Sequence, residues 1–405
     1  MFADRAVVID HDAGCCYALC WSPISGDAHS APWLRRTADR LTRLEPAASS
    51  PTPQPITAQP DAVTMRHRCH PQMYRELIGR CLDLIRAGET YEVCLTNTVT
   101  VEGTVDPVHA FRRMRKINPA PFASLLEFDD ASVISASPEG FLRITPDRIA
   151  ESKPIKGTRP RGCTADEDDA LRRGLLTSEK ERAENLIIVD LVRNDLTRVC
   201  MPGSVHVPTL FGVETYASVH QLVSTVRGTL RPGADAVRAL FPGGSMTGAP
   251  KVRTMAILDR LEGSARGVYS GAIGYFSLSG TADLSIAIRT IVSTGGRAEF
   301  GVGGAITALS EPEAEYQETL AKAAALHTVL QSGVGATGLA DFCRGVSVGQ
   351  QSARSAARPA HQPFRPRHAP ATASPVVGRD QCGGRRGDLA VFDVAATDRA
   401  DHALA

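Results

Sequence analysis

The sequence predicts an α+β fold in which mostly antiparallel sheets are flanked by helices. Helix-like and strand-like patterns alternate between residues 65 and 331. The strand-like runs often follow one another across short turns, which favours antiparallel pairing. This stretch is also long enough to bury a sizeable core.

The first 45 residues predict a small N-terminal subdomain. Val7–Ile9 and Cys16–Trp21 flank a turn-forming Asp12-Ala13-Gly14 and predict a hairpin, followed by a helix near Trp33–Leu44. A lone hairpin is marginally stable, so we expect it to pack on something else. Residues 46–64 are punctuated by proline and predict a linker or a long exposed loop.

The central stretch contains the predicted regular elements. Apolar residues at three-to-four spacing predict helices at Met73–Ala87, Val108–Lys116, Glu179–Val192, Ala249–Leu261 and Glu311–Leu330. Two of these begin with capping-box patterns, Ser178 with Glu181 and Ser310 with Glu313. Strands are predicted at Ala123–Phe128, Ser132–Ala136, Val268–Ser277, Leu284–Val292 and Ala298–Thr307. Residues 332–405 lack sustained periodicity and are predicted to be a disordered tail.

Charge and composition limit the partners and the compartment. The 45 Lys and Arg residues balance 44 Asp and Glu residues, which argues against a nucleic-acid binder that relies on a basic field. No apolar run is long enough to span a membrane, and the first residues lack the apolar region of a signal peptide. The ten cysteines are scattered, without Cys-x-x-Cys pairs. We therefore expect a cytoplasmic protein with reduced thiols and with neither nucleic-acid nor membrane partners.

A basic, kinked segment surrounds Lys156. Lys153–Gly162 holds two prolines and two glycines, so its backbone is locally rigid and has amides free to face a ligand. Its other cations would lower the pKa of Lys156 and favour a neutral, nucleophilic amine. A basic surface turn is the alternative interpretation.

Two predicted helices carry regularly spaced carboxylates. Glu181 and Glu184 lie one turn apart, and Glu315, Glu318 and Lys322 fall on one helix face. If the two helices meet at one site, their carboxylates can hold Mg²⁺ together with an anionic substrate. A solvent-exposed charged face is the alternative for both.

Two glycine-rich stretches and one histidine complete the candidates. Phe241–Lys251 lacks the Lys-Ser/Thr pair of a nucleotide P-loop and instead predicts a loop that leads into a helix with Pro250 in its first turn. Gly301–Ala305 lets a ligand approach the backbone. His220 lies on a strand-like run, where a lone histidine is more often structural than catalytic.

Six motifs between about residues 65 and 331 together resemble the chorismate-utilising enzymes, in the order seen in that family: Pro154–Gly162, Glu181–Asp195, Val219–Val226, Gly243–Lys251, Tyr269–Arg289 and Gly303–Lys322. The resemblance implies two mostly antiparallel β-sheets packed as a sandwich with outer helices. It makes residues 65–331 a chorismate-binding catalytic domain and residues 1–45 a truncated N-terminal subdomain.

The resemblance also implies a binding site. Glu184 and Glu318 would be Mg²⁺ ligands, with Glu315 close by. The residues implied to hold the substrate chorismate are Gly157, Thr158, Tyr269, Arg289, Gly303, Gly304, Ala305 and Lys322. Chorismate is a dianion, so a metal ion, a guanidinium and free backbone amides suit it.

Within the family, Lys156 discriminates between activities. In anthranilate synthases the corresponding motif is similar to Pro-Ile-Ala-Gly-Thr. In aminodeoxychorismate synthases it is similar to Pro-Ile-Lys-Gly-Thr, which is the motif found here. The resemblance implies that Lys156 attacks C2 of chorismate as the C4 hydroxyl leaves, and that ammonia then adds at C4 and expels the lysine. Glu139 matches the family's general acid, and His220 matches a histidine that assists proton transfer. Glu92 stands where isochorismate synthases carry a lysine base, which argues against that activity.

The implied function is therefore that of aminodeoxychorismate synthase component I, in p-aminobenzoate and folate synthesis. The chain has no glutaminase-like motif, so ammonia would come from a separate glutamine amidotransferase subunit or from solution. Two alternatives stay open. One is anthranilate synthase component I, and the other is an inactive, truncated homologue that acts only as a binding subunit.

Overall fold

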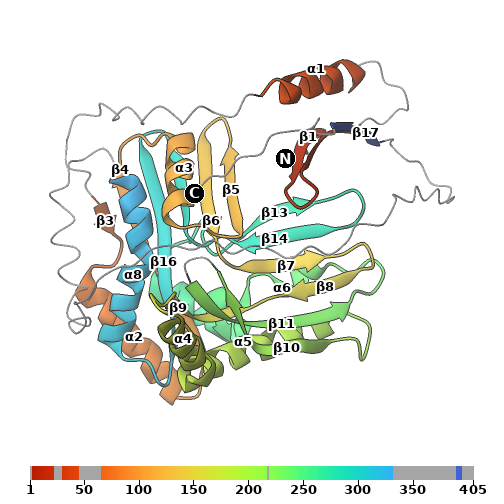
Figure 1. Cartoon of the computed structure of the whole chain (residues 1–405). Helices are drawn as coiled ribbons and strands as arrows, with labels where there is room; N and C mark the ends of the chain where they lie inside the picture. Colours follow the sequence, from red (N-terminus) through yellow and green to blue (C-terminus); the bar gives the residue numbers. More distant parts are fainter. Residues whose placement is uncertain (1, 22–29, 45–64, 217–218, 332–388, 395–405) are drawn as a thin grey trace. The chain divides into compact units, whose positions relative to one another are not determined.

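The computed structural model describes residues 2–21, 30–44, 65–216 and 219–331, together with the backbone of residues 389–394 (Figure 1). The chain forms two units, residues 1–56 with 353–405 and residues 57–352. Their boundary falls inside residues 46–64, and all of this predicted linker lies outside the described residues.

The first unit contains the predicted hairpin and helix. Strands β1 (Arg5–Asp10) and β2 (Cys15–Trp21) pair antiparallel. Helix α1 (Ser30–Thr42) buries Leu34 with Ala18 and Cys20 of β2. The backbone of β17 (Leu389–Val394) pairs antiparallel with the other edge of β2. Of residues 332–405 the structure describes only this strand, so the predicted disorder of the rest of the tail lies outside the described residues.

The second unit contains two antiparallel sheets, whose strands run crosswise in Figure 1. The first sheet has the order β12 (Gly248–Ala249), β4 (Glu92–Glu102), β16 (Arg297–Thr307), β15 (Thr290–Thr294), β6 (Ala131–Ser137) and β5 (Phe122–Glu127), with β3 (Met65–His67) also on β4. The second has the order β10 (His206–Thr215), β11 (Val219–Thr229), β8 (Ile149–Ser152), β7 (Gly140–Ile144), β14 (Ala282–Ile286) and β13 (Ala272–Phe276), with β9 (Ile155–Pro160) also on β11.

Helices cover both sheets. Those on the first sheet are α2 (Pro71–Arg86), α3 (Pro107–Ile117), α7 (Lys251–Glu262) and α8 (Pro312–Leu330). Those beside the second are α4 (Ala165–Thr177), α5 (Glu179–Thr197) and the short α6 (Ala236–Leu240). Separate clusters of buried apolar side chains form the cores, with Phe300 and Leu326 in one and Leu142 and Ile188 in another. Within the described residues, no helix has both the length and the apolar character needed to cross a membrane.

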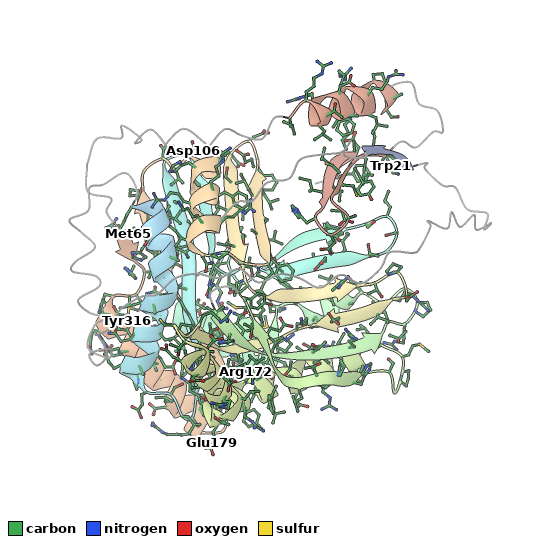
Figure 2. The ribbon with its side chains drawn as sticks, viewed as in Figure 1. Trp21, Met65, Asp106, Arg172, Glu179 and Tyr316 are labelled. Atoms are coloured by element: carbon green, nitrogen blue, oxygen red, sulfur yellow. The ribbon has the colours of Figure 1, made fainter. Side chains whose placement is uncertain are left out.

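The helix starts follow the sequence with two exceptions, one of which is α7, where Pro250 precedes the helix as its N-cap and does not lie in the predicted first turn. The side chains of Asp106 (labelled in Figure 2) and Ser178 accept hydrogen bonds from the first turns of α3 and α5. The second predicted capping box is wrong, because α8 begins after Glu311 and Ser310 instead donates a hydrogen bond to Glu315 at 2.7 Å. Helix α4 was not predicted, since it buries only Leu175 and has no clear apolar face.

The chain crosses between the two sheets at two points that matter for function. Strand β6 of the first sheet leads through Pro138 and Glu139 into β7 of the second. The predicted strand Leu284–Val292 is in fact two strands, β14 and β15, in different sheets. Arg289 lies in this second crossing, directly before β15, with a φ of 48°, a left-handed conformation that redirects the chain.

Candidate active site

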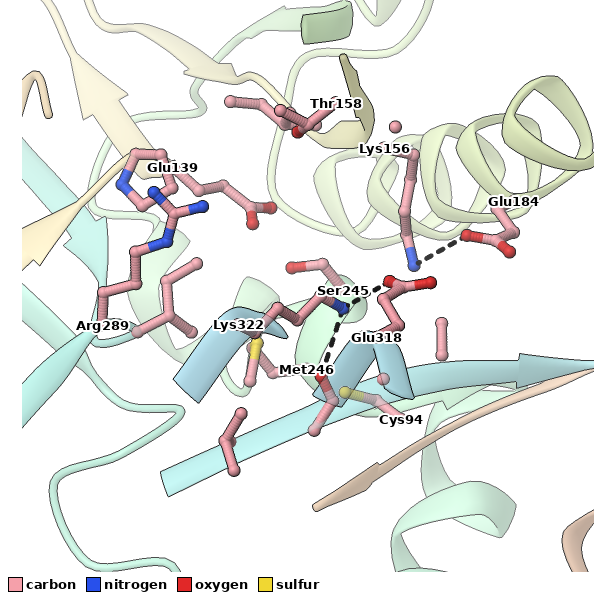
Figure 3. A pocket seen from close by; sticks show the side chains of 18 of the residues that line it. Cys94, Glu139, Lys156, Thr158, Glu184, Ser245, Met246, Arg289, Glu318 and Lys322 are labelled. Carbon is pink, nitrogen blue, oxygen red and sulfur yellow. Dashed lines mark hydrogen bonds and ion pairs between the residues drawn. The ribbon is translucent and has the colours of Figure 1, made fainter. Parts of the chain in front are cut away.

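A cavity of about 510 Å³ opens where the two sheets meet (Figure 3). Its walls come from β9, β16, both crossings, and helices α5 and α8. The volume is that of a small-molecule site. The predicted site residues that line it are Glu139, Lys156, Gly157, Thr158, Glu184, Tyr269, Arg289, Gly303, Gly304, Ala305, Glu318 and Lys322.

Lys156 extends from β9 into the cavity. Its Nζ donates a hydrogen bond to Glu92 Oε1 at 2.7 Å and lies 3.9 Å from Glu184 Oε2. Glu92 comes from β4, and its side chain is fully buried. Burial alone would lower the pKa of Lys156, but the charges of Glu92 and Glu184 outweigh it and raise that pKa. The predicted lowering by neighbouring cations is therefore wrong.

The neighbouring cations have carboxylate partners of their own. Within the same segment, Lys153 pairs with Glu214 and Arg159 pairs with Glu181. Arg161 pairs with Asp168. Each of these positive charges is thus largely compensated by its own carboxylate. The local field at Lys156 is set instead by buried carboxylates from other elements.

Glu139 lies in the first crossing between the sheets and is 8% exposed. Burial raises its pKa to about 7, although Ser245 and the charge of Lys156 oppose the shift. A carboxylic acid with this pKa is partly protonated at neutral pH and can donate a proton inside the cavity. Its position and its pKa both suit the predicted general acid.

Carboxylates of α5 and α8 meet at the cavity, as the sequence predicted. Glu184 is 7% exposed, and burial raises its pKa to about 7. Its Oε1 is buried without a hydrogen-bond partner, while Glu318 pairs with Lys322 Nζ at 2.8 Å. Among the described residues, no group of three or more His, Cys, Asp and Glu side chains is arranged for a metal ion. Glu184 Oε1, which accepts no hydrogen bond, and the carboxylate of Glu318 fit Mg²⁺, which needs few protein ligands when water and substrate complete its shell.

Arg289 and Tyr269 line the wall next to β16. Arg289 donates a hydrogen bond to Asn118 Oδ1 at 2.7 Å, which fixes the direction of its guanidinium. Tyr269 packs on the glycine stretch so closely that a Cβ at Gly301 would lie 2.1 Å from its ring. This stretch is part of strand β16, and glycine is needed there to admit the tyrosine.

His220 does not line the cavity. Its Nε2 lies 2.9 Å from Asp168 Oδ1 on α4, and its Nδ1 lies 2.9 Å from Thr215 Oγ1. Successive residues of a strand point to opposite faces, so Gln221 lines the cavity in its place. The predicted role of His220 in proton transfer therefore lacks a geometric basis in this structure.

Several lining residues were missed by the sequence reasoning. One lies beside the predicted carboxylates of the acidic helix, two lie in the loop singled out before α7, one follows His220 on the strand-like run, and one comes from a strand that was not predicted. In that order they are Lys180, Ser245 with Met246, Gln221 and Cys94. A strand pattern over Glu92–Glu102 would have placed Cys94 and Glu92, but its register could not be read from the sequence alone.

A family model described as chorismate binding enzyme matches residues 1–328. The chain belongs to the chorismate-binding enzyme family. The fold class of this chorismate-binding enzyme, α+β with two antiparallel sheets and outer helices, is confirmed. The crystal structure of anthranilate synthase component I from Streptococcus pneumoniae TIGR4 is similar with a TM-score of 0.69 and 33% identity, covering 79% of this chain and 71% of that one.

Curated relatives of this chorismate-binding enzyme carry more specific names. Aminodeoxychorismate synthase from Streptomyces pristinaespiralis is 55% identical over 345 residues, covering 83% of this chain and 48% of the relative. Aminodeoxychorismate synthase component 1 from Klebsiella aerogenes is 45% identical over 252 residues, covering 62% of this chain and 56% of the relative. The chain thus spans about half the length of the curated relatives it matches.

Proposed function

We propose that the chain is an aminodeoxychorismate synthase component I, which converts chorismate and ammonia into 4-amino-4-deoxychorismate and water. The observation that carries the proposal is Lys156, an amine held in the cavity by Glu92 and Glu184. The names of the two curated relatives support the same activity.

The first half of the reaction uses Lys156 and Glu139. Glu92 Oε1 is the nearest acceptor for a proton of Lys156, and the freed amine attacks C2 of the chorismate ring. Electrons of the ring double bonds shift toward C4, and the C4 hydroxyl leaves as water with a proton from Glu139. The product of this half is a covalent adduct on Lys156.

The second half releases the enzyme. Ammonia adds at C4, the double bonds shift back, and the C2–Nζ bond breaks to return the amine of Lys156. Glu139, now ionised, can accept the surplus proton of the added ammonia, so protons and electrons balance over the cycle.

Substrate carboxylates require positive partners in the cavity. Arg289 and Lys322 supply two, and backbone amides near Gly157 and along β16 supply further donors. Glu184 and Glu318 would hold magnesium, which supplies a charge for a substrate carboxylate when bound. Lys322 Nζ also donates to the carbonyl oxygen of Gly303 at 3.2 Å, so α8 and β16 are tied at the place where substrate binds.

The wider setting follows from the proposed chemistry. Ammonia comes from a glutamine amidotransferase subunit or from solution, and the product leads to p-aminobenzoate and folate. These reactions take place in the cytoplasm.

The test is product identification. Purified chain is incubated with chorismate, Mg²⁺ and ammonium, and the products are separated and identified by mass spectrometry. We expect 4-amino-4-deoxychorismate without release of pyruvate. Anthranilate as the main product would overturn the proposal in favour of anthranilate synthase component I. Absence of turnover by folded protein would instead favour an inactive homologue with a binding role.

A further inference from the structure

The ammonium of Lys180 lies between two buried carboxylates at the cavity. Its Nζ donates to Glu315 Oε1 on α8 at 2.9 Å and lies 3.8 Å from Glu184 Oε1 on its own helix. The side chains of Glu184 and Glu315 are 9% and 3% exposed, whereas that of Lys180 is 36% exposed. Lys180 is thus the solvent-facing member of a buried cluster.

The position of Lys180 in its helix is unfavourable for a cation. Helix α5 begins at Glu179, so Lys180 lies in the first turn, where the helix dipole favours negative charge. Figure 2 labels Glu179 at this start. The contacts with Glu184 and Glu315 provide the compensating attraction, which indicates that this ammonium serves the acidic cluster.

The other lysines of the cavity have separate tasks in the proposed function. Lys156 is the proposed nucleophile, and Lys322 pairs with Glu318 and contacts the carbonyl of Gly303. Lys156 also lies 3.9 Å from Glu184, but of these three lysines Lys180 is the one that pairs with both Glu184 and Glu315. Two buried carboxylates from facing helices would otherwise repel each other, because they share a medium of low dielectric constant.

We infer that Lys180 is an internal counter-ion. It forms ion pairs with Glu184 and Glu315 in the metal-free protein and competes with Mg²⁺ for these carboxylates. This inference rests on the magnesium site of the proposed function. Metal binding at Glu184 then displaces the Lys180 ammonium toward solvent. Lys180 thereby sets the affinity for the metal ion and holds α5 to α8 before it binds.

The test measures metal binding directly, without turnover. Mg²⁺ affinity is measured by calorimetry, and Mn²⁺ binding by electron paramagnetic resonance, for the full chain and for Lys180→Gln. The glutamine amide can still donate a hydrogen bond to Glu315 but carries no charge. We expect Lys180→Gln to bind Mg²⁺ at least about tenfold more tightly, equivalent to about 1.4 kcal/mol. Its metal-free form should melt at a lower temperature, and Mg²⁺ should raise its melting temperature more than that of the unaltered chain.

Two further variants make the result specific. Lys180→Arg keeps the charge and should bind Mg²⁺ like the unaltered chain. Lys153→Gln removes the same charge from a lysine of similar exposure, 38%, that pairs with Glu214, and should leave Mg²⁺ affinity unchanged. Unchanged or weaker binding by Lys180→Gln would overturn the inference, as would equal tightening by Lys153→Gln. Binding of neither metal by any form would overturn it together with the magnesium site, while the product assay still decides the activity.

Discussion

Lys156→Ala is expected to slow the formation of 4-amino-4-deoxychorismate by at least about 10³-fold, because loss of a covalent nucleophile removes the main route of a reaction. Lys156 is the amine that the structure places in the cavity between Glu92 and Glu184. Alanine can neither attack C2 nor be expelled by ammonia. The rate is measured under saturating chorismate and ammonium by quantifying product with mass spectrometry.

Folding has to be separated from chemistry in this experiment. Removal of Lys156 leaves the fully buried carboxylate of Glu92 without its partner, and loss of one member of a buried pair costs about 3–5 kcal/mol. The double variant Lys156→Ala with Glu92→Gln removes both charges and should regain much of that stability without regaining activity. Lys153→Ala, in the same segment, controls for loss of a lysine. An unchanged rate in folded Lys156→Ala would remove lysine from the mechanism.

Glu139→Gln is expected to lower kcat by about 10²–10⁴-fold, the range for loss of a general acid. Glutamine keeps the size of the side chain but has no proton to give to the leaving C4 hydroxyl. Since burial raises the pKa of Glu139 to about 7, the acid form dominates below that pH and the carboxylate above it. The kcat of the unaltered chain should therefore fall as pH rises through about 7.

The pH profile separates this role from a structural one. In Glu139→Gln, the decline above neutral pH should disappear from the residual rate. Glu102→Gln, at the exposed end of β4, is the charge-matched control and should retain both the rate and the decline. Persistence of the same decline in Glu139→Gln would assign it to another group.

Local patterns predicted most elements but not the way they are joined. Apolar spacing located α2, α3, α5, α7 and α8, and a capping-box pattern located Ser178 at the start of α5, because helices are specified by neighbours in sequence. The run Leu284–Val292 looked like one strand, since nothing in its composition shows that Arg289 turns the chain from one sheet to the other. That turn is what brings Arg289 to the cavity.

The sequence motifs located most of the site residues, but they did not predict the charged partners of those residues. Lys156 was predicted to have a lowered pKa from the cations adjacent in sequence, yet its nearest charge is Glu92, 64 residues away. His220 shows the opposite error. It belongs to a site motif, but strand alternation points its ring toward Asp168 on α4, a helix that the sequence did not reveal. In both cases the environment of the side chain is set by a carboxylate that is distant in sequence, Glu92 for Lys156 and Asp168 for His220.

The most direct measurement of the central claim is the mass of the protein after incubation with chorismate and Mg²⁺ in the absence of ammonium. Without ammonia the covalent adduct has no acceptor at C4 and should accumulate. We expect the protein to gain the mass of chorismate less one water, and peptide mapping to place the gain on Lys156. Product formation on addition of ammonium without any such adduct, or an adduct on another residue, would contradict the account.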